Sequence, residues 1–376
     1  MGLKIPNIRA LMARGTWAEG VVGVLPSVTY PSHTTMITGV PPSVHGIASN
    51  KVVDPLGASN DAWMWYAEEI AVPTLVDIAR SRRLRIASVS WPVSVGWAAN
   101  WNVPEFWRSS HPIDRHLLDA ISTPGIIADA AAHRGKPFPH RWSDQERVDV
   151  ARFLIETYRP ALTLLHIFET DSAQHDHGPM SAEVLRAVEE ADARIGQLLA
   201  SVRKAGIEER TLFMIVSDHG FLPVSATLRP NVLLREAGLI RVDAKGKVTN
   251  WDGWFQTDGG SAALVLREPS QVLVERVRGM FSERTGIHAV IDGARVRELG
   301  GTSPLVLDAK EGFSFSSDVE GKWSSASSQK GTHGFAPDRP EMHAALIAAG
   351  PGIERGSRGI MRMTGLTPVL LVPGPL

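Results

Sequence analysis

Short apolar runs alternate with amphipathic segments along most of this chain. The apolar runs predict buried strands at residues 21–25, 85–90, 162–168, 212–216 and 344–349. Apolar residues at helical spacing predict helices at 5–14, 147–158 and 181–204, the last with the clearest apolar stripe. Strands that alternate with helices predict a layered α/β domain, in which helices flank a largely parallel central sheet.

The pattern changes between residues 224 and 329. Strands are predicted at 262–266 and 289–291 and a helix near 271–281, while the Ser- and Gly-rich stretch 313–331 reads as a loop. We therefore predict a small inserted α+β subdomain at residues 224–329. The α/β core would consist of residues 1–223 and 330–376.

Composition narrows the classes of function. The 376 residues are 43% hydrophobic and 21% charged, which predicts a folded chain with a sizeable core. The net charge of -1, without a basic block, argues against binding to a nucleic-acid polymer or an anionic membrane. The sequence has no Cys, so neither a disulfide nor a thiolate metal site is possible. No apolar run approaches the roughly 18 residues of a membrane span, and no signal-peptide core follows Met1. These features leave the compartment and the oligomeric state open.

Side chains of the types that bind metal ions form three short clusters. Asp171 and His175 are about one helical turn apart, Asp218 and His219 follow a predicted buried strand, and His333 lies in a Gly-rich stretch. Carboxylates and imidazoles together suit zinc-like divalent ions, and the carboxyl end of a strand is where open α/β sheets build their sites. The set predicts a metal-dependent hydrolase.

Each cluster also has a simpler reading. Asp171 and His175 could be a surface Asp and a packing His, and Asp218 could only cap a turn. Two further candidates lie upstream. Thr29 is either a strand residue or a nucleophile beside a helix N-terminus that favours anions, and Asn50 is either a turn residue or part of the site. His33 is expected to make structural hydrogen bonds.

Taken together, these segments resemble the alkaline phosphatase superfamily, and within it the nucleotide pyrophosphatase/phosphodiesterase (type I phosphodiesterase) branch. The matching segments run in the family's order over most of the chain. They are 29–33 (Thr-Tyr-Pro-Ser-His), 38–47 with Asn50, 90–92 (Ser-Trp-Pro), 171–175, 218–220 (Asp-His-Gly), 231–238 and 333–334 (His-Gly).

The resemblance implies an alkaline-phosphatase-like fold and a site with two divalent metal ions, zinc in the first place and manganese as the alternative. Asp171, His175 and His333 would hold one ion, while Asp218, His219 and the Thr29 oxygen would hold the other. Thr29 would be the nucleophile of a reaction that passes through a phospho-threonine. Asn50 would help to steady a phosphoryl oxygen. The substrate would be a small phosphate ester, with a nucleotide as one option.

One residue of the family pattern has no counterpart. The family's second metal site contains a further Asp at the end of an N-terminal strand, and this sequence has no carboxylate in that context. We expect either that this strand is missing from the chain as given, or that the second site is three-coordinate and weakened. Two other functions stay open: a phosphomonoesterase or phosphonate hydrolase of the same superfamily, and a catalytically silent member. A sulfatase is disfavoured, since that branch needs its own Cys or Ser motif.

Overall fold

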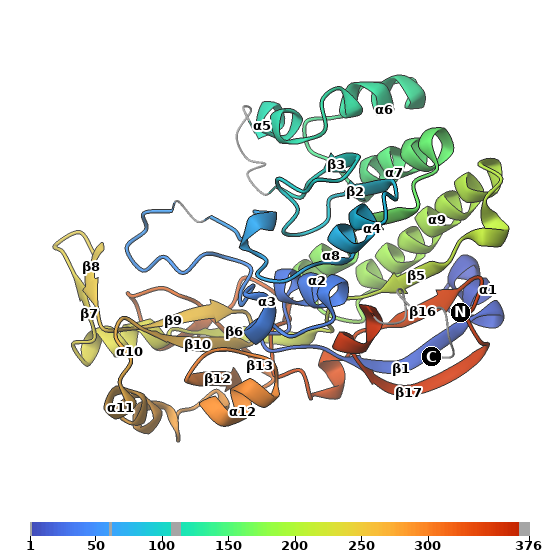
Figure 1. The fold of residues 1–376 in the computed structure, drawn as a ribbon. Helices are drawn as coiled ribbons and strands as arrows, with labels where there is room; N and C mark the ends of the chain where they lie inside the picture. The colour runs from blue at the N-terminus through green and yellow to red at the C-terminus, as the bar shows by residue number, and fades with distance from the viewer. Residues whose placement is uncertain (1, 60–61, 107–113, 368–376) are drawn as a thin grey trace.

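The computed structural model describes residues 2–59, 62–106 and 114–367, and Figure 1 shows strands in several groups with helices packed against them. One group is a four-stranded sheet in the order β17-β1-β16-β5. Strand β1 runs parallel to β17, while β16 runs antiparallel to both β1 and β5. The strands are β1 (Thr16–Val22), β5 (Phe213–Val216), β16 (Leu346–Ala349) and β17 (Gly356–Arg362). Three of the four strands therefore point the same way.

A second sheet of three strands is entirely parallel, in the order β3-β2-β4. Its strands are β2 (Ile86–Val89), β3 (Trp101–Val103) and β4 (Leu162–Leu165). All four residues of β2 are buried, as expected of a central strand covered on both faces. With the first sheet, this confirms the predicted layered α/β fold with a largely parallel sheet.

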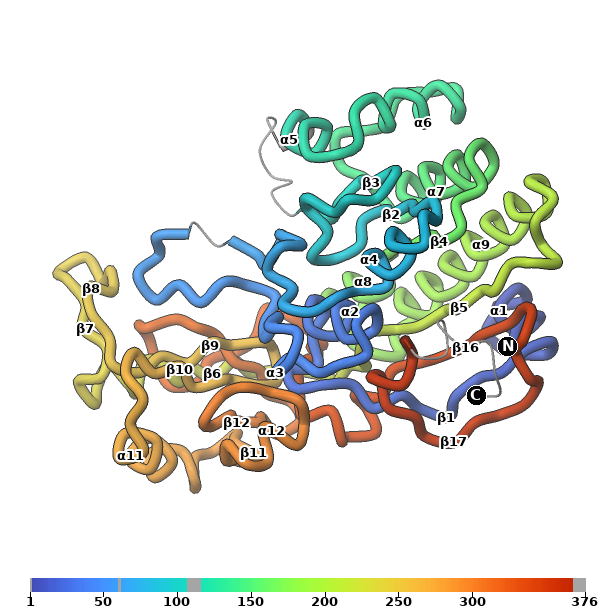
Figure 2. The backbone as a smooth tube through the Cα atoms, in the orientation of Figure 1, coloured from blue at the N-terminus to red at the C-terminus, as the bar shows by residue number. Residues whose placement is uncertain are grey.

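Helices cover both sheets, and in Figure 2 the blue α2 lies at the centre of the view. Helix α7 packs on β2 and β4, α9 packs on α7, and α1 lies between α9 and β16. Capping boxes fix the starts of α4 and α7, where Thr74 and Ser143 pair with an acidic residue three positions later. The helices are α1 (Pro6–Arg14), α2 (Thr29–Thr38), α3 (Pro42–His45), α4 (Leu75–Ser81), α5 (Asp114–Ile121), α6 (Ile126–Arg134), α7 (Asp144–Tyr158), α8 (Glu169–His177) and α9 (Ala182–Lys204).

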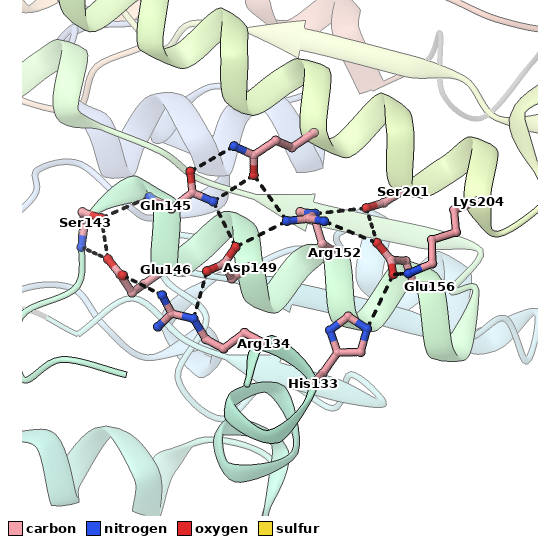
Figure 3. Close-up of polar contacts among 11 residues, drawn as sticks. His133, Arg134, Ser143, Gln145, Glu146, Asp149, Arg152, Glu156, Ser201 and Lys204 are labelled. Atoms are coloured by element: carbon pink, nitrogen blue, oxygen red, sulfur yellow. Dashed lines mark hydrogen bonds and ion pairs between the residues drawn. The ribbon is translucent and has the colours of Figure 1, made fainter. Parts of the chain in front are cut away.

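A chain of polar contacts ties α6, α7 and α9 together (Figure 3). Arg134 of α6 contacts Glu146 at 3.1 Å and Asp149 at 3.0 Å, both on α7. Further along, the carboxylate of Glu156 accepts hydrogen bonds from Ser201 and Lys204 of α9, each at 2.6 Å. These charges lie in the seam between the helices, so they fix how the three helices pack.

The rest of the chain forms smaller sheets around a separate apolar cluster. A four-stranded sheet has the order β11-β12-β10-β9, and β6 pairs with β13, β14 and β15. The cluster is built around three large buried rings, Phe255, Phe281 and Phe335. The elements are β6 (Leu222–Leu228), α10 (Pro230–Glu236), β7 (Ile240–Val242), β8 (Val248–Trp251), β9 (Gly253–Asp258), β10 (Ser261–Leu266), α11 (Gln271–Phe281), β11 (Ile287–Asp292), α12 (Gly293–Glu298), β12 (Leu305–Ala309), β13 (Gly312–Phe315), β14 (Ser324–Ala326) and β15 (Gly331–Thr332).

Two local predictions were wrong. The expected loop at 313–331 contains β14 and parts of β13 and β15, because β6 offers them a hydrogen-bonding edge that the Ser- and Gly-rich composition does not reveal. The strand expected at 21–25 lies instead at Thr16–Val22. Its position is set by pairing with β16 and β17, which begins at Thr16. No helix in the described part of the chain is both long and apolar enough to cross a membrane.

Candidate functional site

Helix α8 carries two of the predicted metal ligands on one face. Asp171 and His175 are four residues apart, and the Nε2 atom of His175 lies 3.5 Å from the Oδ2 atom of Asp171. The other ring nitrogen of His175, Nδ1, lies 3.0 Å from the carbonyl oxygen of Gly331. If Nδ1 donates to that carbonyl, Nε2 is left as the unprotonated nitrogen that a metal ion requires.

His333 joins this pair from the segment that follows β15. Its Nε2 atom lies 3.7 Å from the Oδ1 atom of Asp171, and one ligand atom from each of Asp171, His175 and His333 lies within 4.8 Å of the other two. The Oδ1 atom of Asp171 is buried and has no hydrogen-bond partner among the described residues. A buried carboxylate oxygen without a partner is costly, and a cation at this point would satisfy it.

The turn between β9 and β10 holds the His333 segment in place. The amide of Gly260 donates to the carbonyl oxygen of His333 at 2.8 Å. A Cβ atom on Gly334, whose φ is +89°, would lie 1.8 Å from the carbonyl oxygen of Asp258. Only glycine permits this close approach of the two backbones. The β9–β10 turn therefore fixes the backbone that carries the His333 imidazole.

Burial changes the protonation of this group. It lowers the pKa of His333 well below its usual value, and the neighbouring His219 and His175 act in the same direction. Burial raises the pKa of Asp171, against the effect of the nearby histidines. A neutral imidazole is the form that binds metal ions, so the site favours ligation by His333.

Asp218 and His219 follow β5, at the carboxyl end of that strand. The Nε2 atom of His219 lies 3.2 Å from the Oδ2 atom of Asp218. Burial would raise the pKa of Asp218, but the charge and the hydrogen bond of His219 outweigh burial and hold it well below its usual range. The His219 ring stacks on His333 with centroids 3.9 Å apart and planes 25° apart. The two predicted metal-binding clusters are therefore in direct contact.

Thr29 is the first residue of α2, at the end of the helix where the macrodipole favours an anion. Its carbonyl oxygen lies 2.8 Å from the Nδ1 atom of His33, and that nitrogen lies 3.6 Å from the Oδ2 atom of Asp218. His33 therefore makes the structural hydrogen bond expected of it. It also connects the start of α2 to Asp218.

Asn50 lies against the same helix N-terminus. Its Oδ1 atom accepts a hydrogen bond from the amide of Tyr30 at 2.8 Å, which fixes the orientation of the Asn50 side chain. The preceding residue, Ser49, donates to the Oδ1 atom of Asp258 at 2.9 Å. The start of α2, Asn50 and the β9–β10 turn thus form one hydrogen-bonded unit.

The sequence analysis missed two buried residues, His166 near Asp218 and Glu105, which contacts His166. His166 directly follows β4, and its Nδ1 atom lies 2.6 Å from the Oε2 atom of Glu105. His33, His166 and Asp218 form a second group whose ligand atoms all lie within 4.8 Å of one another. Of the partners predicted for Asp218, His219 contacts it directly, and the Thr29 carbonyl oxygen contacts His33. His166 could have been found, because the carboxyl end of a predicted strand is a preferred position for site residues. The predicted strand, however, ran to residue 168, so His166 was taken as a strand residue and its position just after the strand was missed.

Comparison with known proteins places this site in a family. The sequence model of the type I phosphodiesterase / nucleotide pyrophosphatase family matches residues 1–336. Venom phosphodiesterase 2 of Crotalus adamanteus is 23% identical over 93% of this chain and 40% of its own length. Ectonucleotide pyrophosphatase/phosphodiesterase family member 3 of Mus musculus is 25% identical over 57% of this chain and 22% of its own length. The chain thus spans less than half the length of these relatives.

Solved structures show the same fold. Human ectonucleotide pyrophosphatase/phosphodiesterase 5 matches with a TM-score of 0.67 at 19% identity, over 97% of this chain and 88% of its own. An inactive form of the murine protein, in complex with AMP, matches with the same TM-score at 18% identity, over the same shares of both chains. The family match covers nearly nine-tenths of the sequence and includes the predicted site residues. The chain therefore belongs to the type I phosphodiesterase / nucleotide pyrophosphatase family.

Proposed function

We propose that this protein is a metal-dependent hydrolase of phosphodiester or pyrophosphate bonds, with Thr29 as its nucleophile. The observation that carries the proposal is the continuous set of contacts from Asp171 through His333 and His219 to Asp218, which ends at the helix that Thr29 begins. Carboxylate and imidazole side chains thus gather at the start of a helix whose first residue carries a hydroxyl group. That combination suits the transfer of a phosphoryl group.

Two divalent cations fit the residues present. Asp171, His175 and His333 would hold one, and Asp218 would hold the other, with His219 and Thr29 as its predicted neighbours. Nitrogen and carboxylate oxygen donors in these numbers favour zinc, and manganese is the alternative. When bound, such ions lower the pKa of a coordinated hydroxyl group and neutralise charge on phosphoryl oxygens.

The protein's own groups bind, orient and accept the phosphoryl group. The Thr29 oxygen would attack phosphorus, forming the Thr29 O–P bond as the bond to the leaving group breaks. Water would then cleave the phospho-threonine, which returns the hydroxyl group and releases phosphate or a phosphomonoester. The side-chain amide of Asn50, whose Oδ1 atom accepts a hydrogen bond from the Tyr30 backbone amide, and the positive end of the α2 dipole would stabilise the equatorial oxygens.

A nucleotide is the substrate class we favour. The neighbour of known structure that binds AMP has the same fold, and the proposed site offers cations and a helix N-terminus for its phosphate. The Trp91 ring lies edge-on to His33 of α2, with centroids 4.8 Å apart, so it is the aromatic side chain to test beside the proposed phosphate position. A base or an aryl leaving group could pack there.

Replacing Thr29 tests the proposal. Thr29→Ala is expected to lower turnover of bis(p-nitrophenyl) phosphate, assayed with zinc or manganese, by at least about a thousandfold, because the nucleophile is lost. Thr29→Ser is expected to retain partial activity, since it keeps the oxygen. Parallel assays with p-nitrophenyl phosphate and a phosphonate ester would show which bond the site prefers.

Thr249→Ala is the matched control, because this threonine is exposed and its hydroxyl group donates to the carbonyl oxygen of Arg241 in β7. It is expected to leave turnover unchanged. Folding is checked by circular dichroism for every variant. Unchanged turnover in a folded Thr29→Ala protein would remove Thr29 from the mechanism, and no turnover of any ester by the metal-loaded wild type would refute the proposed function.

A further inference from the structure

The segment that carries Asn50 is held by a side chain from a distant part of the sequence. Ser49 and Asp258 are both buried, and the hydroxyl group of Ser49 donates to the Oδ1 atom of Asp258 at 2.9 Å. The two residues are 209 positions apart along the chain. A buried hydrogen bond between such distant residues fixes how their two segments lie against each other, because breaking it would leave both polar groups unsatisfied.

The Ser49 hydroxyl group uses its full hydrogen-bonding capacity at this point. Besides donating to Asp258, its oxygen accepts from the backbone amide of Lys51 at 3.3 Å and from the Nε2 atom of Gln256 at 3.4 Å. A serine hydroxyl group has one donor and two acceptor lone pairs, so all three are engaged. Residues 49–51 are thereby attached to β9, the strand that contains both Gln256 and Asp258.

This attachment reaches the proposed phosphoryl site through Asn50. The Oδ1 atom of Asn50 accepts a hydrogen bond from the Tyr30 amide, so the Nδ2 group is the end of the side chain that can donate to a substrate oxygen. The contact between Ser49 and Asp258 sets the backbone position of Asn50, and the contact with Tyr30 sets the side-chain orientation. The place of the Asn50 amide at the start of α2 therefore depends on both contacts.

The turn that begins at Asp258 also contacts the segment of His333. The side chain of Asp258 bonds to Ser49, while the backbone amide of Gly260, two residues later, donates to the carbonyl oxygen of His333 at 2.8 Å. One short turn therefore fixes the Asn50 segment and the His333 segment relative to each other. Such precision matters for catalysis, since a displacement of about 1 Å can cost about a hundredfold in rate.

We infer that Asp258 is a positioning residue for the proposed hydrolysis and that, acting through Ser49, it places the side-chain amide of Asn50 at the start of α2. The acid and the carboxylate forms of Asp258 both offer an acceptor oxygen, so this role does not depend on its charge. The residue that positions Asn50 thus comes from residues 224–329, the predicted inserted subdomain, and not from the segment around Asn50. The inference rests on the proposed function, because Asn50 has its role in that reaction.

Steady-state kinetics of purified variants test this role. Turnover of bis(p-nitrophenyl) phosphate is measured with saturating zinc for the wild type, Asn50→Ala, Ser49→Ala, Asp258→Ala and Asp258→Asn. Asn50→Ala should lower kcat by about a hundredfold or more, because a donor to the transition state is lost. Ser49→Ala and Asp258→Ala should lower kcat at least about tenfold and change KM by less than about threefold, since a displaced donor weakens the transition state more than the bound substrate. Asp258→Asn should keep most of the wild-type kcat, because its amide oxygen still accepts from Ser49.

A double variant separates positioning from general damage to the fold. In the Asn50→Ala background, adding Asp258→Ala should change kcat by less than about twofold, because residues that act as a unit have non-additive effects. Asp192→Ala is the matched control, since Asp192 is a buried carboxylate that accepts hydrogen bonds from the backbone amides of Asn7 and Ile8, in the contact between α9 and α1. It should lower the melting temperature without changing kcat. Circular dichroism checks every fold, and Ser49→Ala, which removes a single oxygen, decides if Asp258→Ala fails to fold.

Amide hydrogen exchange provides a readout that does not need turnover. The Tyr30 amide donates to Asn50, so its exchange should be at least about tenfold faster in Ser49→Ala and Asp258→Ala, and unchanged in Asp258→Asn and Asp192→Ala. Wild-type kcat in a folded Ser49→Ala protein, or equal losses from Asp258→Ala with and without Asn50, would overturn this inference and leave the proposed function standing. No turnover of any ester by the zinc-loaded wild type would refute the proposed function, and this inference with it.

Discussion

At the residue scale, burial changes the pKa of one carboxyl group, that of Asp258. It ends β9, it is buried, and it accepts a hydrogen bond from Ser49 beside Asn50. Burial raises its pKa from 3.8 to about 6, although the hydrogen bonds from Ser49 and Asn50 act in the opposite direction. The neutral carboxyl form is therefore the one that suits the folded state, and its ionisation near neutral pH opposes folding.

We predict that Asp258→Asn removes this pH dependence. A group whose folded-state pKa is raised contributes stability below its unfolded-state pKa and loses it as the pH rises through the folded-state value. The wild type should thus lose stability, relative to the variant, between about pH 4 and pH 6, by up to about 3 kcal/mol. Urea unfolding across this range measures the difference.

Asp318→Asn serves as the comparison for Asp258→Asn. Asp318 is exposed and pairs with Arg229 at 3.0 Å, so its removal should cost little at any of these pH values. Identical pH profiles for wild type and Asp258→Asn would show that Asp258 ionises in the folded protein as it does in water.

At the scale of elements, the sequence predicted most of what periodicity controls. Helices α1, α7 and α9 and strands β2, β4, β5, β10 and β16 lie where apolar spacing placed them, within a few residues. Strands β13, β14 and β15 could not be foreseen, since only the edge of β6 makes a Ser- and Gly-rich segment extended. The sequence analysis did not identify the His33–His166–Asp218 group for a similar reason. Its members come from three elements far apart in the sequence, and only the fold brings them together.

Strands β4 and β5 meet at the site without a shared hydrogen-bond ladder. Among the described residues, β5 pairs with β16 and β4 pairs with β2, and every residue of β5 is only half-buried. His166 follows β4 and Asp218 follows β5, so the carboxyl ends of both strands contribute to one group of side chains that could hold a metal ion. Unpaired strand edges beside a site are open to a further strand.

In the polar seam between α6, α7 and α9, the carboxylate of Glu156 is predicted to contribute measurably to the free energy of unfolding. Glu156 is almost fully buried and contacts Ser201, Lys204 and His133. Glu156→Gln should lower the free energy of unfolding by about 2 kcal/mol, because charge-assisted hydrogen bonds are lost in a shielded position. Burial alone would raise the pKa of Glu156, but its hydrogen bonds to Lys204 and Ser201 outweigh burial and lower it. The difference should therefore be present above about pH 4.5 and fade as the pH falls through the folded-state pKa.

The exposed pair of Glu183 and Arg186 on α9 is the control for Glu156. Glu183→Gln should change the free energy of unfolding by less than about 0.5 kcal/mol. Equal effects of the two substitutions would mean that the seam in Figure 3 adds no more stability than a surface ion pair.

At the scale of the whole molecule, the candidate ligands come from separately packed groups of strands. His166 follows the β3-β2-β4 sheet, Asp218 follows the sheet that contains β5, and His333 follows β15, which pairs with β6. Figure 1 shows these groups meeting around α2. Cations bound to this set would hold the groups together, so metal binding should stabilise the protein as a whole.

We predict that zinc raises the melting temperature of the chelator-treated protein. A ligand at about a hundred times its dissociation constant adds about 2.7 kcal/mol per site, which corresponds to an increase of several degrees for two sites in a chain of this size. Scanning calorimetry measures the shift, and resistance to trypsin should rise with it. Magnesium, which binds imidazole poorly, should have little effect. An unchanged melting temperature with zinc would contradict a role for metal in holding the sheets together.

The glycine contacts behind His333 bear on how this protein can be recombined with its relatives. A Cβ atom on Gly259 would lie 2.4 Å from the carbonyl oxygen of His333, and one on Gly260 would lie 2.3 Å from a ring carbon of Phe335. The β9–β10 turn and the His333 segment are about seventy positions apart in the sequence. They pack so closely that the glycines of the turn leave no room for one additional methyl group. In a chimera made by exchanging residues 224–329 between family members, these two segments should be inherited as a pair. A junction that separates them would displace His333, a proposed metal ligand, even though none of the proposed ligands had been exchanged.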